Sequence, residues 1–425
     1  MRYYSTRNRN EAVSFAAAAL AGLAPDGGLY VPKEIPEYSA AVKSSLGTMP
    51  YIDIAFETIR PWVKGDIPDS ALSDILASAY PFTAPLAEVG DRLVLELFHG
   101  PTAAFKDFGA RFMARAFSYL RRGEDKPLKI LVATSGDTGG AVADGFYGVE
   151  GISATVLYPK GRVSPLQERQ IAGLGGNISA LAVEGSFDDC QRLVKQAFTD
   201  EDFKKKHVLS SANSINVSRL IPQAVYYAAA AGQALNVIFC VPSGNFGNLT
   251  AGLYAYKMGA PVAAFIAATN INKTVPDYLE SGNYEARLSK ATFSNAMDVG
   301  DPSNFERMKA HFSLEEMRRL ISGISVSDDE TLKTISEVFS GRGYYLDPHT
   351  AVGWKAVDKA GKISDKPRII LSTAHPAKFA EIVEPVTGPV PVPPSLQAAM
   401  ERTVDARIIS ADLNALKEHL LNEHA

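Results

Sequence analysis

Short apolar runs alternate with longer helical segments, and this alternation most constrains the fold of the chain. From Leu93 onward, runs such as LKILVAT and NVIFCVP are separated by stretches of helical periodicity. The pattern is typical of a mainly parallel sheet covered by helices, because parallel strands need a long crossover connection. The expected strands are 92–98, 128–134, 152–159, 178–184, 236–242, 261–269 and 367–373. The expected helices are 108–121, 139–147, 165–174, 187–198, 214–231 and 248–257.

The length of 425 residues predicts more than one substructure, because a single hydrophobic core rarely grows that large. The first ninety residues are helical and broken by APDGGLYVPKEIPEY, which favours a separate layer. The tail is Pro-rich (EPVTGPVPVPP) before an amphipathic helix near 413–421. We therefore predict an α/β protein with an N-terminal mainly helical layer (1–90), a smaller α/β domain (91–210) and a larger α/β domain with a C-terminal extension (211–425).

The charge balance excludes several classes of partner. The chain has 43 Lys+Arg and 47 Asp+Glu, a net charge of -4, so general binding to nucleic acid or to an anionic membrane is not expected. No apolar run is long enough to span a membrane, and the N-terminus lacks the apolar core of a signal peptide. Cys190 and Cys240 stand far apart in apolar stretches, which indicates a reducing compartment. We expect a cytoplasmic protein without a metal site, and the sequence leaves monomer and homodimer open.

Two expected strands end in nearly the same way. The segments LVATSGDTGGAVADGF and FCVPSGNFGNLTAGLYA both run from an apolar strand through a glycine-rich turn into a helix. Such a turn presents backbone N–H groups and the positive end of the helix dipole to an anion. Glycine-rich turns are also common without any ligand, but a pair at one sheet edge favours two anion sites. Neither turn matches the dinucleotide or the nucleoside triphosphate motif.

The side chains in the two turns suggest different anions. The second turn suits a cofactor phosphate because glycines surround a side-chain amide: Ser243, Gly244, Asn245, Phe246, Gly247 and Asn248. The first turn carries more hydroxyls and suits a substrate carboxylate: Ser135, Gly136, Asp137, Thr138 and Gly139. The residues alone permit the reverse assignment. An ionised Asp137 would repel a bound anion unless it points elsewhere or accepts a hydrogen bond.

Lys106 stands between Phe105 and Phe108, behind a Gly-Pro-Thr turn. If the aromatic rings exclude water, burial should lower the pKa of its amine, and a neutral amine can form a Schiff base with an aldehyde. The alternative is an ordinary lysine that begins a helix with its amine in water. Together with a phosphate-binding turn, Lys106 suggests pyridoxal phosphate as the cofactor.

Several long motifs carry a family resemblance. The strings HGPTAAFKDFG, ATSGDTGG, SSANSINVSRLIPQ, VPSGNFGNLTAG, MDVGDPSNFER and LSTAHPAKF occur in this order after an opening YYSTRN. The chain from its N-terminus to about Glu384 resembles the threonine synthases of the bacterial and fungal type. The resemblance implies a fold-type II pyridoxal-phosphate enzyme, related to tryptophan synthase β. It also implies conversion of O-phospho-L-homoserine and water to L-threonine and phosphate by γ-elimination and β-replacement, the last step of threonine biosynthesis.

The resemblance also implies roles for individual residues. Lys106 matches the lysine that holds the cofactor as a Schiff base, and the segment 244–248 matches the loop for the cofactor phosphate. Thr373 matches a hydroxyl near the pyridine nitrogen, with Ser372 as the adjacent alternative. The segment 135–138 matches the loop for the substrate carboxylate. Many dehydratase-like relatives have Asn where this chain has Asp137, a position near the cofactor's 3'-oxygen, so that contact stays open.

A polar cluster offers donors for the phosphate of the substrate: Asn213, Ser214, Asn216 and Arg219. Capping of the following helix, with one solvated arginine, is the structural alternative. The lone histidines His99, His349 and His375 are more often structural than catalytic. Two other functions remain as alternatives: a serine/threonine dehydratase-like lyase of the same fold, and a non-catalytic threonine-synthase-like binding protein.

Overall fold

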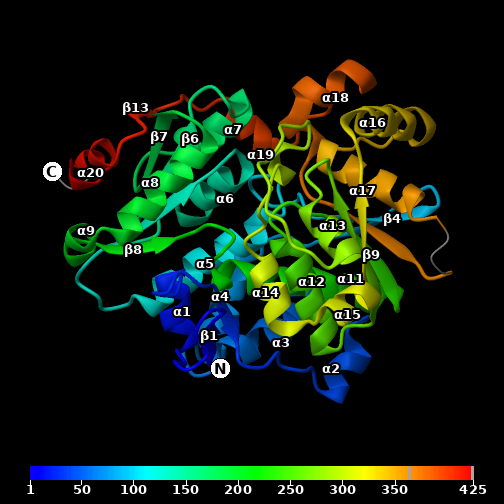
Figure 1. Cartoon of the computed structure of the whole chain (residues 1–425), viewed down its shortest axis with the longest axis horizontal. Coiled ribbons are helices and arrows are strands. Elements are labelled where there is room, and N and C mark those ends of the chain that lie inside the picture. Colours follow the sequence, from blue (N-terminus) through cyan, green and yellow to red (C-terminus); the bar gives the residue numbers. More distant parts are fainter. Residues whose placement is uncertain (362–364, 423–425) are drawn as a thin grey trace.

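The N-terminal segment forms a mainly helical layer at the bottom of Figure 1. The structure is a computed structural model and describes residues 1–361 and 365–422. Two short antiparallel strands open the chain, and Ser14 caps the helix between them by accepting from Ala17 N. The elements of this layer are β1 (Tyr3–Ser5), α1 (Phe15–Ala21), β2 (Tyr30–Pro32), α2 (Ala40–Ser45), α3 (Tyr51–Val63) and α4 (Asp69–Ala79). The predicted layer is therefore helical, with one small strand pair that the sequence pattern did not reveal.

A five-stranded parallel sheet lies toward the left of Figure 1 in the order β13-β7-β6-β5-β8. Its strands are β5 (Leu128–Ala133), β6 (Ile152–Pro159), β7 (Ile178–Glu184), β8 (Val208–Ser211) and β13 (Arg407–Ser410). The helices between residues 106 and 206 are α5 (Lys106–Leu120), α6 (Asp137–Phe146), α7 (Pro165–Ala172), α8 (Phe187–Thr199) and α9 (Glu201–Lys206).

A six-stranded sheet has the order β11-β10-β9-β12-β4-β3, with every neighbouring pair parallel except β3 and β4. Its strands are β3 (Leu86–Val89), β4 (Arg92–Glu96), β9 (Val237–Pro242), β10 (Val262–Thr269), β11 (Ile321–Ser325) and β12 (Arg368–Ser372). The remaining helices are α10 (Val217–Leu220), η1 (Ile221–Gln223), α11 (Ala224–Ala234), α12 (Gly247–Met258), α13 (Thr274–Ser281), η2 (Asn295–Met297), α14 (Phe305–His311), α15 (Leu314–Leu320), α16 (Asp328–Arg342), α17 (Pro348–Lys359), η3 (Pro376–Phe379), α18 (Ala380–Thr387), α19 (Pro394–Met400) and α20 (Leu413–Asn422).

Alternate residues of the central strands enter different cores. In β5, Ile130 joins the large core shared with α5, α6, α11 and α12, whereas Leu131 joins a smaller core with α8 and α20. In β9, Phe239 joins the large core and Cys240 packs on the other side of the sheet. Both strands are therefore buried on two faces, as expected for parallel sheets, which explains their continuous apolar sequences.

Two segments lie in a different sheet from the one that the predicted division suggests. Strand β4, within the segment predicted for the smaller domain, pairs with β12 of the six-stranded sheet. Strand β13, in the tail, pairs with β7 of the five-stranded sheet, and Figure 1 shows α20 beside α8. Hydrogen bonding between strands that are distant in the sequence therefore decides to which sheet each strand belongs. The domain boundaries stay a prediction.

The α/β architecture is confirmed, and each predicted strand is present. The predicted single helix 214–231 is wrong: it is divided into α10, η1 and α11, and begins only at Val217. Asn216 caps its first turn, and Pro222 lies in the 3-10 segment. The sequence pattern also missed β3, β8, β11 and β13, which are short strands of four or five residues.

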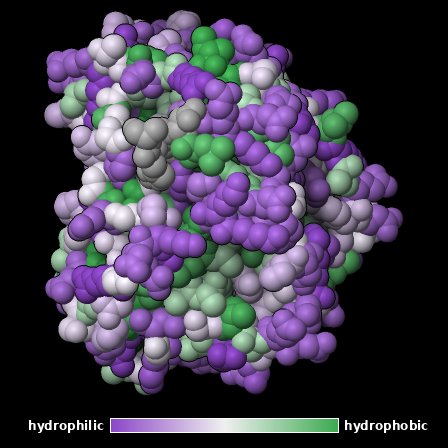
Figure 2. All heavy atoms as spheres, turned by 90° about the vertical axis from the view of Figure 1, so that its left-hand side faces the viewer, coloured by the Kyte–Doolittle hydropathy of each residue, from purple (hydrophilic) through white to green (hydrophobic). Residues whose placement is uncertain are grey.

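Hydrophilic side chains predominate on the face shown in Figure 2, and hydrophobic ones are scattered among them. Within residues 1–361 and 365–422, no helix combines the length and the apolar character needed to cross a bilayer.

Candidate active site

Lys106 is the first residue of α5, and its side chain is only 14% exposed. Its amine nitrogen lies 5.8 Å from the centre of the Phe105 ring. Phe108 is fully buried and packs against Tyr226, so it belongs to the core. Burial lowers the pKa of Lys106 to about 8, although Asp137 acts in the opposite direction. The predicted direction of the pKa shift is confirmed.

The turn before Lys106 is fixed by a buried carboxylate. Asp107 accepts hydrogen bonds from Thr102 N (2.9 Å) and from the Thr102 hydroxyl (2.5 Å). Burial raises the pKa of Asp107 to about 6. A Cβ at Gly100 would lie 2.4 Å from Asp107 Oδ2, so only glycine fits beside this carboxylate. Ala103 has φ +52°, a left-handed conformation that the surrounding hydrogen bonds must hold.

Backbone hydrogen bonds join this turn to the segment after β12. Phe105 N donates to Thr373 O (2.9 Å), and His375 N donates to Ala103 O (3.0 Å). Two motifs separated by more than 260 residues, HGPTAAFKDFG and LSTAHPAKF, therefore lie side by side. The backbone of Thr373 is therefore bonded to Phe105, the residue before Lys106.

The environment of Ser372 and Thr373 distinguishes the two hydroxyls that the sequence left open. Ser372 lies 3.1 Å from the Thr350 hydroxyl of α17, on the side of the sheet away from α5. Successive side chains of an extended segment alternate between faces, so Thr373 belongs to the face of Leu371, which joins the large core. This arrangement favours Thr373 as the hydroxyl nearer to Lys106.

In the first glycine-rich turn, a neighbouring hydroxyl already binds some of the backbone N–H groups. The Thr134 hydroxyl accepts from Gly136 N (3.0 Å) and Gly139 N (2.9 Å), so two of the expected free donors are already bonded. Gly136 has φ +146°, which L-residues rarely adopt, and α6 begins directly after it. Ser135 and Thr138 remain partly exposed, so their hydroxyls are accessible.

Asp137 is buried in this turn, and cations surround its carboxylate. Oδ1 accepts from Lys378 Nζ (2.9 Å) and Gln167 Nε2 (3.1 Å), whereas Oδ2 lies 3.9 Å from Lys106 Nζ. Burial opposes ionisation, but Lys378 and Lys106 hold the pKa of Asp137 well below its ordinary value. The positive charges of Lys378 and Lys106 therefore compensate the negative charge of the carboxylate. This compensation removes the expected repulsion between Asp137 and a bound anion.

The second glycine-rich turn connects β9 to α12. Phe246 has φ +58°, and a Cβ at Gly244 would lie 2.6 Å from Met297 Cα. Asn248 Oδ1 accepts from the Tyr226 hydroxyl (2.6 Å) and the Tyr227 hydroxyl (2.8 Å). Its Nδ2 is buried and has no hydrogen-bond partner among the described residues. An unpartnered donor at a helix N-terminus fits a phosphate group.

Ser214 links the second turn to the predicted substrate cluster. Its hydroxyl accepts from Asn245 Nδ2 (2.7 Å), and its carbonyl accepts from Asn304 Nδ2 (3.3 Å). Asn304 Oδ1 in turn accepts from Arg307 (2.6 Å), which is fully buried and also donates to Ile215 O. The motif MDVGDPSNFER, through Asn304 and Arg307, thus binds the backbone of the segment 213–216.

Two members of the predicted cluster make hydrogen bonds that stabilise the fold. Asn213 Nδ2 donates to Ala133 O (3.0 Å) at the end of β5. Asn216 is fully buried, donates to Ala19 O and Ser211 O, and accepts from Ser218. Its hydrogen-bonding capacity is filled, so the structure favours the capping alternative for Asn216.

Arg219 is the strongest candidate for binding an anion in this cluster. It is 2% exposed, donates to Ala212 O (2.7 Å), and its Nε is buried without a partner in the part of the chain that the structure describes. Burial lowers the pKa of Arg219 to about 10, although Asp107 opposes the shift. A buried guanidinium with an unused donor is suited to a phosphate or carboxylate ligand.

Lys378 and Gln167, the two residues that hold Asp137, are not among the residues predicted from the sequence. Lys378 lies in the quoted motif LSTAHPAKF, where its position between Ala377 and Phe379 was the available indication of burial. Gln167 lies at the start of α7, where it also completes a capping box with Ser164. Both residues are distant from Asp137 in the sequence, so the sequence alone does not predict their contacts with it.

The histidines have structural partners. His99 lies 2.8 Å from Glu96 Oε2, and His375 caps η3 by accepting from Ala377 N. His349 is buried, with Nδ1 2.8 Å from Asp347 Oδ1 and Nε2 accepting from Ala296 N (3.2 Å). In the described ranges, no group of His, Cys, Asp and Glu side chains has a metal-binding arrangement.

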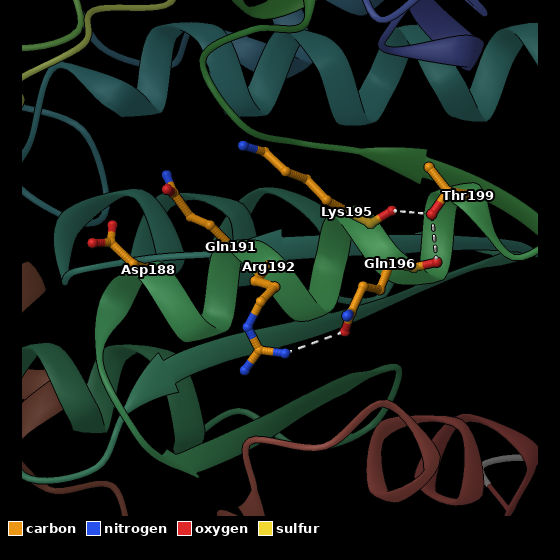
Figure 3. A pocket seen from close by; sticks show the side chains of 6 residues that line it. All are labelled: Asp188, Gln191, Arg192, Lys195, Gln196 and Thr199. Atoms are coloured by element: carbon orange, nitrogen blue, oxygen red, sulfur yellow. Dashed lines mark hydrogen bonds between the residues drawn. The ribbon is translucent and has the colours of Figure 1, made fainter. Parts of the chain in front are cut away.

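Figure 3 shows a pocket on α8 that none of the predicted site residues lines. Its lining side chains come from successive turns of one helix: Asp188, Gln191, Arg192, Lys195, Gln196 and Thr199. Arg192 is paired with Asp189 (2.9 Å) and also donates to Gln196. None of these lining residues has a buried side-chain nitrogen or oxygen without a hydrogen-bond partner in the described chain.

Comparison with known protein families gives three matches along the chain. Residues 2–80 match "Threonine synthase N terminus", 84–373 match "Pyridoxal-phosphate dependent enzyme", and 350–420 match "Threonine synthase, C-terminal". Threonine synthase of Escherichia coli is 42% identical over 99% of this chain and 100% of its own length. Threonine synthase of Saccharomyces cerevisiae is 38% identical over 90% of this chain and 88% of its own.

Solved structures agree with these matches. Threonine synthase from Escherichia coli superposes with a TM-score of 0.92 at 41% identity, covering all of both chains. A threonine synthase from Brucella melitensis, solved with bound PLP, has a TM-score of 0.92 at 38% identity and covers 99% of this chain and 98% of its own. A threonine deaminase at 16% identity, with a TM-score of 0.55, shares the fold alone.

Proposed function

The chain belongs to the threonine synthase family of pyridoxal-phosphate-dependent enzymes, and we propose that it converts O-phospho-L-homoserine and water to L-threonine and phosphate. It is a lyase of fold type II. The observation that carries the proposal is the buried amine of Lys106, with a pKa of about 8, close to the carboxylate of Asp137 at the start of α6.

Residues of both turns fit the cofactor. Lys106 would hold it covalently, and segment 244–248 would hold its phosphate, with Asn248 Nδ2 as a donor that has no other partner in the described chain. Thr373 would place a hydroxyl, rather than a carboxylate, at the pyridine nitrogen. Asp137 lies beside Lys106 and would face the 3'-oxygen, a contact that stays part of the proposal.

Bound pyridoxal phosphate acts as an electron sink for an amino-acid substrate. The chain's own residues bind, orient and exchange protons with the substrate. The Lys106 amine, once neutral, can accept a proton because its pKa is near the physiological range. Ser135 and Thr138 would hold the substrate carboxylate, because both residues are partly exposed and lie at the N-terminus of α6.

Arg219 and Ser214 are the proposed contacts for the phosphate of the substrate. Arg219 brings a buried positive charge with an unused donor, and Ser214 connects directly to Asn245 of the second turn. Asn213 stands beside them, whereas Asn216 fixes the backbone that presents them. Loss of phosphate is helped by such a cation, because it stabilises the charge that develops on the leaving group.

A parallel assay tests the proposal. Purified enzyme is incubated with O-phospho-L-homoserine while phosphate release and threonine formation are measured, and with L-threonine while 2-oxoacid formation is measured. We expect phosphate and threonine in equal amounts. Predominant 2-oxoacid from threonine without phosphate release would support the dehydratase alternative, and no turnover of either substrate would support the binding-protein alternative.

The cytoplasm is the proposed location of the reaction. Cys190 and Cys240 are both free and buried, as expected in a reducing compartment where disulfides do not form. Burial raises the pKa of the Cys190 thiol to about 12, so this side chain is an inert core residue.

A further inference from the structure

Lys378 carries a charge that the proposed reaction does not use. Its side chain has no exposed surface, and its amine donates to Asp137 Oδ1 (2.9 Å) and Thr102 O (2.8 Å). Lysine is rarely buried unless a carboxylate compensates for its lost hydration, and Asp137 is the carboxylate present here. Lys378 belongs to η3, and Asp137 is the first residue of α6.

The two oxygens of Asp137 have different surroundings. Oδ1 is held by Lys378 and by Gln167 Nε2 (3.1 Å). Oδ2 faces Lys106 Nζ at 3.9 Å, which is beyond hydrogen-bonding distance but within reach of a strong electrostatic interaction. The side chain of Asp137 is thus anchored on the side away from Lys106.

We propose that Lys378 is a positioning residue, whose ammonium group anchors the Asp137 carboxylate and so prevents a closed ion pair between Asp137 and the Lys106 amine. The inference rests on the proposed role of Lys106 as the reacting amine. A closed pair would keep Lys106 protonated, whereas an anchored carboxylate leaves a neutral fraction that can react.

The charges around Lys106 support this role. Burial is the largest cause that lowers the pKa of Lys106, Asp137 raises it, and Lys378 and Arg219 lower it. Around Asp137, burial opposes ionisation, while Lys378, Lys106 and His349 favour it. Lys378 therefore acts on Lys106 twice, through its own positive charge and through the position in which it holds Asp137.

Two further carboxylates belong to these surroundings, Asp107 on α5 and Asp144 on α6. Asp107 interacts with Lys378 and Arg219, and its own pKa is raised by burial and by Asp144. Both carboxylates stay in place in the experiment below, so their contributions are common to all variants.

A purely structural role for Lys378 makes a different prediction. Lys378 shares the acceptor Thr102 O with Gln170 Nε2 (3.2 Å), so it could serve only to pin the turn before Lys106. Loss of that hydrogen bond would lower stability but would not raise the pKa of Lys106. Because the Lys378 charge also lowers the pKa of Lys106 directly, the Lys378 variants are titrated beside Gln167→Leu, which removes an anchor of Asp137 but no charge.

The experiment titrates the Lys106 amine in the full-length enzyme after removal of the cofactor. Each variant is first shown to be folded and to regain its visible absorption band when pyridoxal phosphate is restored. Trace acetylation at a series of pH values, followed by mass spectrometry, gives the pKa of Lys106. Lys160, a surface lysine paired with Glu184, serves as the labelling reference in the same sample.

We expect Lys378→Met to raise the pKa of Lys106 by about one unit or more, a roughly tenfold loss of neutral amine at neutral pH. Lys378→Arg should keep the wild-type value, because it keeps the charge. Asp137→Asn should lower the pKa, and the double variant Lys378→Met/Asp137→Asn should lie near wild type because the two opposing charges are both removed. An unchanged pKa in folded Lys378→Met would overturn the proposal.

If Lys378→Met does not fold, the test rests on Gln167→Leu, which removes the second anchor of Asp137 Oδ1. A smaller rise in the pKa of Lys106 is expected there, and an unchanged value would count against anchoring. No outcome depends on turnover, so failure of this inference and failure of the proposed function are separate results.

Discussion

The two glycine-rich turns look alike in sequence but differ in how their polar groups are used. In the first turn, the Thr134 hydroxyl occupies two backbone N–H groups, and the Asp137 carboxylate is neutralised by Lys378. In the second turn, Asn248 keeps a buried amide donor without a partner in the described chain. Glycine sets the shape of both turns, while the side chains around them determine which anion each can accept.

The largest expected effect comes from Lys106, which lies against the first turn. Lys106→Ala should reduce turnover by about 10³-fold or more, because the amine that exchanges protons is lost. The variant should also lose the visible band of lysine-bound cofactor. It should still bind pyridoxal phosphate non-covalently, because the second turn is intact, and equilibrium dialysis measures that binding.

Lys160→Ala is the matched control, since it removes a lysine that pairs with Glu184 on the surface. Its activity and absorption spectrum should equal those of the wild type. A Lys106→Ala variant with an unchanged visible band would contradict the role of Lys106. It would also contradict the proposed difference in function between the two turns.

The next largest effect is expected in the second turn. Asn248→Asp keeps an acceptor for the Tyr226 and Tyr227 hydroxyls but replaces the unused donor with negative charge. Affinity for pyridoxal phosphate should fall by about 100-fold, since a charge-assisted hydrogen bond is lost and a like charge is added. Titration of the cofactor-free enzyme by absorbance measures this change.

The KM for O-phospho-L-homoserine, measured with saturating cofactor, should change much less than the cofactor affinity in Asn248→Asp. Equal losses in both quantities would mean that the second turn also holds the substrate. The proposal that the two turns bind different ligands would then be wrong.

The smallest effect is expected in the first turn. Ser135→Ala should raise the KM for the substrate by about tenfold, the loss of one hydrogen bond to a charged group, and leave cofactor affinity unchanged. Steady-state kinetics and the same absorbance titration give the two values. A fall in cofactor affinity with constant KM would show that the assignment of the two turns is reversed.

Sequence patterns predicted local features well, because these depend on neighbouring residues. Strand β6 coincides with a predicted segment, and helix α8 differs from one by a single residue, as continuous apolar runs and helical periodicity require. The predicted helix 214–231 failed because its first residues, including Ser214, bond to segments far along the chain instead. Short strands such as β13 were missed because four residues carry too little pattern.

By itself, the sequence determined the order of strands and helices, the glycine-rich turns, and the unusual setting of Lys106. Each follows from residues next to one another in the chain. Only the tertiary structure decided that Ser372 bonds to Thr350, that Asn216 supports the fold, and that Lys378 holds Asp137. These contacts arise where strand ends meet, so the positions of parallel strands, and not sequence neighbours, place the charges around the reacting amine.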